Sequence, residues 1–204
     1  MTSNRRVWLW VAGCLIGVVA LAVAFWLDPV IREWVVDHRN RQVRTFMAAV
    51  SRYGDWPSHA ALGLLLLVIA WLRGQKKWAR VFLAMLVACL LAGVATRVIK
   101  VAAGRARPSV QTELAWSGPK LSSKYHSFPS GHTASSTAFF AVLVFVSWRI
   151  GAALLVIPLL IAFSRMYVAA HYLSDVVAAG MVGVFCACVV AKALKLSPPI
   201  GSGD

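Results

Sequence analysis

Long stretches without a charged residue alternate with shorter polar segments along this 204-residue chain. Six charge-free apolar stretches recur, at Val7–Leu27, Pro57–Leu72, Val81–Ala95, Thr133–Trp148, Ile150–Ser164 and Val176–Ala191. A helix that spans a bilayer needs about 20 residues, with a range of roughly 17–25. The first stretch is long enough alone, and the others become so if polar residues at their ends, such as Arg73 and Lys192, reach the interface. The pattern predicts an all-α integral membrane protein, a bundle of six transmembrane helices.

The segment between the first two stretches, Asp28–Trp56, has a different pattern. Apolar Val36, Val43, Met47 and Val50 recur there at helical spacing among several arginines. This predicts an amphipathic helix between the first and second transmembrane helices. It either lies in the membrane interface or packs on the bundle as an ordinary loop helix.

The chain length suits one domain and is too short for two sizeable ones. We predict a single transmembrane domain over residues 1–197, with its polar motifs in 100–175, and a disordered tail over 198–204. The first stretch is longer than the core of a signal peptide, and no small-residue cleavage site follows it. It is therefore interpreted as a transmembrane helix.

Composition narrows the class of protein further. Sixty per cent of the residues are hydrophobic and 14% are charged, which disfavours a soluble globular domain. The net charge of +14 could suit a nucleic acid, but the basic residues are scattered over loops without a soluble domain to present them. Contact with anionic lipid headgroups explains them more simply, so we predict the bilayer as partner and no nucleic acid. The sequence does not fix the oligomeric state.

Three polar clusters lie beside the hydrophobic stretches, at Lys100–Pro108, Pro129–His132 and Ser164–Asp175. With six spans, the long loop after Lys100 and the turn after Arg165 lie on the same side of the membrane. Helix parity alone thus predicts that the three clusters meet at one membrane face. Charged residues at a membrane edge are costly, so a group of them indicates a functional site. The counts of Lys and Arg on the two sides are nearly equal and do not fix the orientation.

The cations and the glycine turn in these clusters suit a phosphate group. Arginine forks bind phosphate oxygens in pairs and lysine acts as a point charge, which predicts a dianion site at Lys100, Arg107 and Arg165. Each of them could alternatively be an interfacial residue that snorkels. Gly131 would let the backbone approach a ligand at the N-terminus of a helix. Ser130 would add a hydroxyl donor or serve only as a helix cap.

The histidines and the aspartate supply possible acid–base and nucleophilic groups. His171 and Asp175 are four residues apart, which on a helix places them on one face. Asp175 could accept the proton of one ring nitrogen, leaving the other as a nucleophile toward phosphorus, and His132 could act as general acid. The same three residues could instead bind iron or zinc, although the nearby cations would repel a divalent metal. The remaining histidines are predicted to be structural: His38, His59 and His126.

Read in order, Lys-x6-Arg-Pro, Pro-Ser-Gly-His and Ser-Arg-x5-His-x3-Asp resemble the three signature motifs of the type 2 phosphatidic acid phosphatase superfamily. That superfamily includes membrane lipid phosphate phosphatases and undecaprenyl-diphosphatase-like enzymes, and soluble acid phosphatases and vanadium haloperoxidases share its site. The resemblance implies that His171 forms a phosphohistidine, that Asp175 supports it, and that His132 is the acid and later the base for water. It further implies phosphate contacts from Lys100, Arg107, Ser130, Gly131 and Arg165, with no metal or other cofactor.

The resemblance also implies a bacterial inner-membrane location, with the site facing the periplasm or cell exterior. The candidate substrates are phosphatidic acid, phosphatidylglycerol phosphate, undecaprenyl diphosphate and lipid A phosphate. Two alternatives to hydrolysis stay open at this point. The protein could pass the phosphoryl group to another lipid, or it could bind or transport a lipid phosphate without catalysis.

Overall fold

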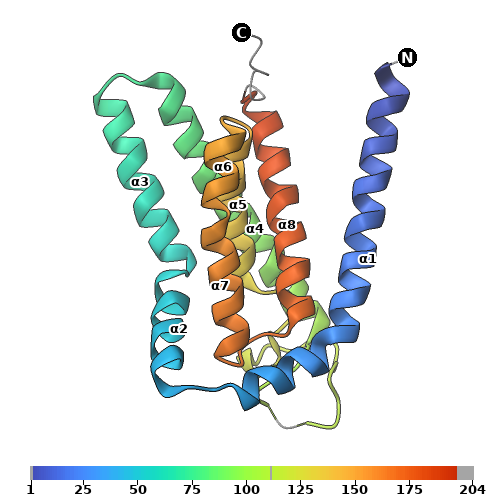
Figure 1. Ribbon diagram of the computed structural model, residues 1–204. Coiled ribbons are helices and arrows are strands. Elements are labelled where there is room, and N and C mark those ends of the chain that lie inside the picture. Colours follow the sequence, from blue (N-terminus) through green and yellow to red (C-terminus); the bar gives the residue numbers. More distant parts are fainter. Residues whose placement is uncertain (1, 111, 197–204) are drawn as a thin grey trace.

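The computed structural model describes residues 2–110 and 112–196 (Figure 1). The predicted tail over 198–204 lies outside these residues. The regular elements of the described part are helices, in this order: α1 (Thr2–Asp37), α2 (Arg41–Tyr53), α3 (Trp56–Leu72), α4 (Lys76–Ala103), the short 3₁₀ helix η1 (Ser123–Tyr125), α5 (Gly131–Val144), α6 (Trp148–Leu154), α7 (Val156–Tyr167) and α8 (Leu173–Ala193). Each predicted apolar stretch coincides largely with one helix, except that Ile150–Ser164 is divided between α6 and α7.

The helices form an integral membrane bundle with four to five candidate spans. Four segments in the described ranges are long and apolar enough to cross a membrane, namely Trp10–Asp37, Lys76–Ala103, Trp148–Tyr167 and Leu173–Ala193. The bent pair of α2 and α3 adds a fifth if it is counted as one span. Helix α5 has 14 residues, which at 1.5 Å per residue is roughly 21 Å. It is shorter than the hydrocarbon core of about 30 Å, and for this reason the predicted count of six is not reached.

Small residues allow the central helices to pack closely. Helix α5 is buried along almost its whole length between α4 and α8. The contact is made largely by alanines that are fully buried: Ala84, Ala88 and Ala92 on α4, Ala134 and Ala138 on α5, and Ala179 and Ala187 on α8. At Gly183 a Cβ atom would lie 2.7 Å from the Ala134 carbonyl oxygen. Such positions let helix backbones approach within a membrane.

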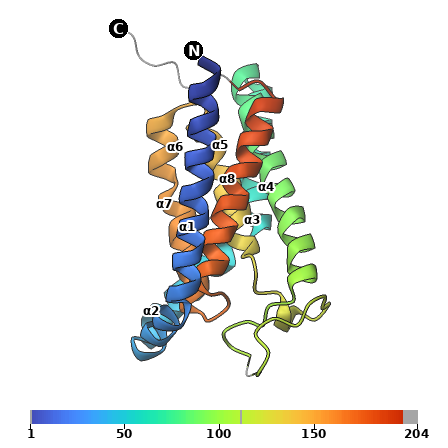
Figure 2. The same cartoon turned by 90° about the vertical axis from the view of Figure 1, so that its right-hand side faces the viewer.

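Helix α1 lies outside this core and beside α8 (Figures 1 and 2). Pro29 is inside the helix, and Figure 1 shows the last turns of α1 running across the end of the bundle. Proline removes one helical hydrogen bond and clashes with the preceding turn, which accounts for a bend. The loop between α4 and α5 and the turn between α7 and α8 lie at this same end of the bundle. The three polar clusters therefore meet at one end, as helix parity predicts.

Helix α2 is the predicted amphipathic helix, although it is shorter than the segment that suggested it because α1 continues to Asp37. The Asn40 side chain accepts hydrogen bonds from the backbone N–H groups of Gln42 and Val43 and so caps its N-terminus. Met47 and Ser51 are buried on the side that packs against α7. Helix α2 thus packs on the bundle, and its predicted position in the membrane interface stays a prediction. A bend of 53° then separates α2 from α3.

Candidate active site

Six of the eight predicted site residues line one cavity of about 810 Å³: Lys100, Arg107, Gly131, His132, Arg165 and His171. They come from α4, the loop after it, the start of α5, the end of α7 and the turn before α8. Ser130 and Asp175 are fully buried behind the cavity wall. The fold therefore brings all three clusters together, with two of their residues set back from the cavity.

A glycine turn separates the cations at the end of α4. Gly104 ends the helix in a left-handed conformation with φ +57°, and a Cβ atom there would lie only 1.7 Å from the Gly118 carbonyl oxygen. Only glycine avoids both penalties. The chain therefore turns away from the helix, leaving Lys100 on α4 and placing Arg105 and Arg107 in the loop.

The three predicted phosphate-binding cations have no acidic partner in the described part of the chain. Among residues 2–110 and 112–196, Lys100, Arg107 and Arg165 take part in no ion pair. Lys100 Nζ donates to the His126 carbonyl oxygen at 3.1 Å, and Arg165 Nη1 donates to the Ser51 hydroxyl on α2. The Nε atoms of Arg107 and Arg165 are buried without a hydrogen-bond partner among these residues. Burial lowers the pKa of Arg107 below its usual value, so the cluster is a desolvated group of like charges.

The turn between α7 and α8 presents His171. Ala169 adopts a left-handed conformation, and the backbone N–H groups of Ala170 and His171 donate to the Arg165 carbonyl oxygen. These bonds satisfy the C-terminal carbonyl of α7 and hold His171 beside Arg165. Because α8 begins at Leu173, His171 precedes the helix rather than lying on it, which differs from the predicted helical pairing with Asp175.

The hydrogen bonds of His171 assign its tautomer. Nδ1 lies 2.7 Å from the Ser127 carbonyl oxygen and 3.5 Å from Asp175 Oδ2. A carbonyl oxygen only accepts, so Nδ1 carries the proton and Nε2 has a free lone pair. Burial, followed by the charges of Lys100 and Arg165, lowers the pKa of His171 to about 3. The ring is therefore neutral at pH 7, and its nearest acceptor is the carbonyl oxygen of Ser127 rather than the predicted Asp175.

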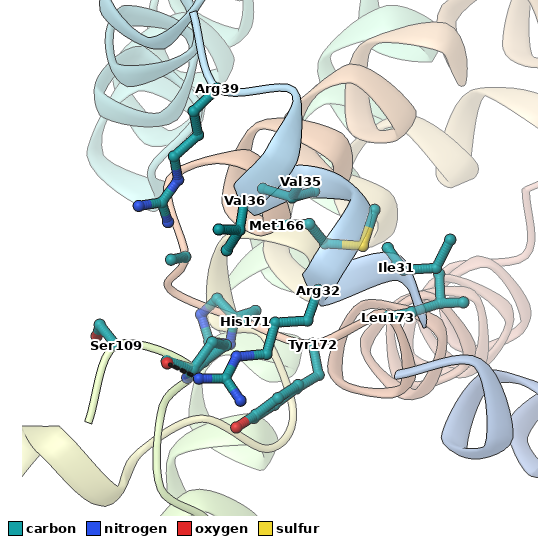
Figure 3. Close-up of a pocket in the computed structure, with 12 residues that line it drawn as sticks. Ile31, Arg32, Val35, Val36, Arg39, Ser109, Met166, His171, Tyr172 and Leu173 are labelled. Carbon is teal, nitrogen blue, oxygen red and sulfur yellow. Dashed lines mark hydrogen bonds between the residues drawn. The ribbon is translucent and has the colours of Figure 1, made fainter. Parts of the chain in front are cut away.

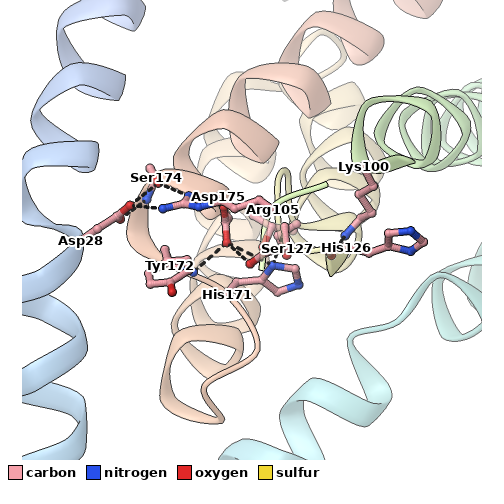
Figure 4. Close-up of polar contacts among 11 residues, drawn as sticks. Asp28, Lys100, Arg105, His126, Ser127, His171, Tyr172, Ser174 and Asp175 are labelled. Atoms are coloured by element: carbon pink, nitrogen blue, oxygen red, sulfur yellow. Dashed lines mark hydrogen bonds and ion pairs between the residues drawn. The ribbon is translucent and has the colours of Figure 1, made fainter. Parts of the chain in front are cut away.

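Asp175 is held by a network that sequence reasoning did not find (Figure 4). Its Oδ1 accepts from Arg105 Nη1 at 2.6 Å, and its Oδ2 accepts from the Ser127 hydroxyl at 2.5 Å and from the Tyr172 backbone N–H at 2.8 Å. Arg105 also donates through Nη2 to Asp28 Oδ2 at 2.7 Å. Because Asp28 is on α1 and Arg105 lies within the spacer of the first motif, only the fold reveals this contact.

His132 faces a carboxylate that was also not predicted. It is the second residue of α5, and its Nε2 lies 3.6 Å from Asp55 Oδ1 at the bend between α2 and α3. Asp55 caps α3 by accepting from the Trp56 backbone N–H at 2.8 Å, and it lines the same cavity. The structure therefore places a half-exposed acid next to the predicted proton donor.

The Pro-Ser-Gly-His turn buries Ser130 but places Gly131 at the cavity. Ser130 is the N-cap residue of α5 and is fully buried, with its hydroxyl accepting from Thr133 Oγ1 at 3.1 Å. Its backbone N–H donates to the Asp175 carbonyl oxygen. Gly131 faces the cavity, and a Cβ atom there would lie 3.9 Å from Lys100 Nζ. The role of Ser130 as a phosphate ligand stays a prediction.

The histidines predicted to be structural differ from one another. His59 packs edge-on against Phe139 and Phe140, and His38 is exposed and stacks on Trp34. His126, however, lines the cavity. Its Nε2 lies 2.8 Å from the Lys120 carbonyl oxygen, and its Nδ1 lies 3.2 Å from Arg97 Nη1. It holds a fourth cation at the edge of the cavity.

The alternative of a metal site at His132, His171 and Asp175 does not match the side-chain positions. In the part of the chain that the structure describes, no three or more His, Cys, Asp or Glu side chains are grouped so as to hold a metal ion. Both carboxylate oxygens of Asp175 instead accept hydrogen bonds from Arg105, Ser127 and Tyr172.

A comparison with protein families shows the family of the chain. Residues 81–197, more than half of the chain, match the PAP2 superfamily. The chain belongs to the PAP2 superfamily. The match contains all three polar clusters, whereas the carboxylates of Asp28 and Asp55 come from the N-terminal region of this PAP2 protein, before the matched residues.

Similar proteins support this assignment. The lipid A 1-phosphatase of Rhizobium johnstonii is 34% identical over 95 residues, which cover 44% of this chain and 38% of that relative. The crystal structure of LpxE from Aquifex aeolicus has a TM-score of 0.63 at 22% identity, covering 81% of this chain and 95% of that chain. The crystal structure of a transmembrane PAP2-type phosphatidylglycerolphosphate phosphatase from Bacillus subtilis has a TM-score of 0.70 at 21% identity, covering 91% of this chain and 95% of that chain. At these identities the two structures show a shared fold.

Proposed function

We propose that this PAP2 protein is a lipid phosphate phosphatase that works through a phosphohistidine on His171 and needs no metal. The observation that carries the proposal is the state of the His171 ring. Its Nδ1–H is held by the Ser127 carbonyl oxygen, so Nε2 is unprotonated. His171 lines a cavity that also contains four cations without a carboxylate partner among the described residues, namely Lys100, Arg107, Arg165 and, at the edge, Arg97.

A phosphate dianion would relieve the repulsion among these cations. Arg107 and Arg165 offer planar forks for pairs of phosphoryl oxygens, and Lys100 adds a point charge. The first N–H groups of α5, including that of Gly131, have no hydrogen-bond partner within the helix, and such groups at a helix N-terminus bind anions. In a desolvated cavity such preorganised charges stabilise the extra negative charge of the transition state more strongly than water does.

The proposed reaction has two steps. Nε2 of His171 attacks phosphorus, the bond from phosphorus to the lipid oxygen breaks, and His132, which enters this step as the imidazolium, donates a proton to that leaving oxygen. Water then attacks the phosphohistidine and gives a proton to His132, which releases inorganic phosphate and restores both histidines. During the first step the ring of His171 becomes positively charged, and its Nδ1–H faces the Ser127 carbonyl oxygen and Asp175.

The apolar part of the cavity supports an amphiphilic substrate. Beyond the charged end, it is lined by residues of α3 and α4, including Ala60, Leu86, Leu90 and Val94. A lipid chain would lie there with its phosphate at His171. A phosphomonoester on lipid A or on a glycerophospholipid is favoured over undecaprenyl diphosphate, because the named relatives are a lipid A 1-phosphatase and a phosphatidylglycerolphosphate phosphatase.

We further propose that α5 is a sixth crossing, shortened because α4 and α8 shield it from lipid. Six crossings agree with the N-terminal end of α1 and the C-terminal end of α8 lying at the same end of the bundle. The site would then lie at the end of the bundle opposite the termini, and we propose, from the family resemblance, that this end is at the extracytoplasmic face of a bacterial inner membrane. An impermeant label placed on a single cysteine in the loop over residues 112–122 of intact cells would test this orientation.

Purified protein in detergent tests the activity directly. Phosphate release should be measured in excess EDTA with phosphatidic acid, phosphatidylglycerol phosphate, undecaprenyl diphosphate and lipid A. His171→Ala is expected to remove activity, whereas His38→Ala, which changes an exposed histidine away from the cavity, should retain it. Substrate labelled with ³²P should leave acid-labile label on the protein only when His171 is present. Full turnover by His171→Ala contradicts the proposal, and label in an acceptor lipid instead of free phosphate would show phosphoryl transfer.

A further inference from the structure

The side of His171 that faces away from the phosphate cavity contains a buried ion network. Asp28, Arg105, Ser174 and Asp175 are each at most 6% exposed. The guanidinium of Arg105 joins the two carboxylates, with Nη2 on Asp28 at 2.7 Å and Nη1 on Asp175 at 2.6 Å. The rings of Tyr172, Trp116 and Phe25 surround it, with centroids 4.2, 4.9 and 5.3 Å from Cζ. Little water reaches this network, so its charges act strongly on one another.

Asp28 also fixes the start of α8. Its Oδ1 accepts from the Ser174 backbone N–H at 2.8 Å, and its Oδ2 accepts from the Ser174 hydroxyl at 2.6 Å. An N–H group in the first turn of a helix has no partner within the helix, and a carboxylate there is favoured by the helix dipole. The last turns of α1 come close to the nucleophile as well, because Ile31, Arg32 and Val35 line a second cavity together with His171 and Tyr172 (Figure 3).

The charge of Asp28 determines the charge that Asp175 presents to His171. Arg105 carries one positive charge between two carboxylates, so the three side chains together carry one negative charge. If the Asp28 carboxylate were neutral, Arg105 would cancel the charge of Asp175. The imidazole of His171 becomes positive when Nε2 bonds to phosphorus. A net negative network beside Nδ1, with Asp175 Oδ2 at 3.5 Å, stabilises that positive charge more strongly than a neutral network does.

We propose that Asp28 is a positioning residue for the proposed reaction. It offsets the charge of Arg105 and orients its guanidinium, so that Asp175 remains an effective anion for the His171 ring. This inference rests on the proposed function. It assigns a role to α1, which precedes the residues 81–197 that match the family.

Asp28→Asn tests the proposal because it removes the charge and the acceptor for Arg105, but keeps the shape and one acceptor oxygen for the Ser174 backbone N–H. We expect kcat and the rate of phosphohistidine formation in rapid-quench experiments to fall by about tenfold or more. KM should stay within about twofold, since Asp28 is separated from the phosphate cavity by His171 and Asp175. The matched control is Glu33→Gln, which removes an exposed carboxylate from the same helix and should leave both constants unchanged.

Asp28→Glu distinguishes a loss of kcat caused by the missing charge from a loss of kcat caused by poorer folding. It retains the negative charge in a longer side chain, so its kcat should lie closer to wild type than that of Asp28→Asn, at a comparable thermal midpoint. Equal kcat for Asp28→Asn and Glu33→Gln overturns the inference. Equal losses of kcat in Asp28→Asn and Asp28→Glu, accompanied by equal drops in midpoint, overturn it as well, because Asp28 would then act only through folding. Wild-type protein that releases no phosphate and forms no phosphohistidine overturns the proposed function and this inference with it.

Discussion

His171 separates two regions that use the same kinds of side chain in opposite ways. On the cavity side, Lys100, Arg107 and Arg165 have no carboxylate partner within the described residues. On the other side, Arg105 lies only two residues before Arg107 but contacts two carboxylates and three aromatic rings. The ring of His171 has one nitrogen for each region. An unpaired cation at this site is positioned to bind an anion, and the paired cation is positioned to hold Asp175 beside the proposed nucleophile.

The sharpest test of this difference compares Arg105→Met with Arg107→Met. Removing Arg105 leaves two buried carboxylates without their cation, which should cost about 3–5 kcal/mol of stability. For a chain of this size the thermal midpoint in detergent should fall by roughly 10 °C. Arg107→Met removes a cation that has no acidic partner in residues 2–110 and 112–196, and it should leave the midpoint nearly unchanged. Equal midpoints for the two variants would contradict the distinction between paired and unpaired arginines.

The cavity side should respond in activity rather than in stability. Arg165→Met removes one proposed donor to the phosphoryl group, which should lower kcat/KM by roughly 100- to 1,000-fold in the phosphate-release assay. It also relieves repulsion with Lys100 and Arg107 while losing one hydrogen bond to Ser51, so the midpoint should change by less than about 2 °C. Ser51→Ala is the control for that bond. A large loss of stability in Arg165→Met without loss of activity would reverse the assignment.

The two regions also differ in how much of them the sequence reveals. Residues of the cavity side form local motifs, and helix parity alone brings these motifs to one end of the bundle. Asp28 is separated from Arg105 by 77 positions, and no periodicity connects a carboxylate at the end of α1 with an arginine inside a motif spacer. One signal was present, because Asp28 follows directly on a charge-free stretch of 21 residues, Val7–Leu27, where a charge is costly unless it has a partner.

Backbone contacts explain the other differences. The acceptor of His171 Nδ1 is the carbonyl oxygen of Ser127, which any residue at position 127 would supply, so residue types could not predict it. The apolar stretch Thr133–Trp148 predicts a span, but α5 ends at Val144. Hydropathy cannot locate that end because the residues that follow, Phe145 and Val146, are also apolar. The exposed fraction of α5, and hence whether it needs to match the bilayer, depends on tertiary packing.

The low pKa of His171 gives a pH dependence of stability. Burial lowers the pKa of His171 to about 3 in the folded protein, against about 6.5 when unfolded. The neutral ring therefore stabilises the fold fully above pH 6.5, and this contribution is lost as the pH falls from 6.5 toward 3. Between pH 7.5 and pH 5 the loss should be about 2 kcal/mol.

His171→Gln supplies the control, because glutamine does not titrate in this range. Thermal midpoints of wild type and His171→Gln should be measured in the same detergent at pH 7.5, 6 and 5. The midpoint of the wild type should fall more steeply than that of the variant, and parallel curves would show that His171 is not held neutral by burial.

The smallest effect should come from Ser127→Ala. This variant tests whether the carbonyl oxygen or the hydroxyl of Ser127 matters more for His171. The variant keeps the carbonyl oxygen that holds Nδ1–H of His171, so the tautomer and the lone pair on Nε2 are preserved. It removes only the hydroxyl that donates to Asp175 Oδ2. Asp175 would still accept from Arg105 and from the Tyr172 backbone N–H.

A single hydrogen bond to a charged group contributes about 1.5–3 kcal/mol at most, and part of this is regained if the remaining donors move closer. We expect kcat to fall by about three- to tenfold with KM unchanged. A loss as large as that of His171→Ala would mean that the hydroxyl, and not the carbonyl, sets the state of the nucleophile.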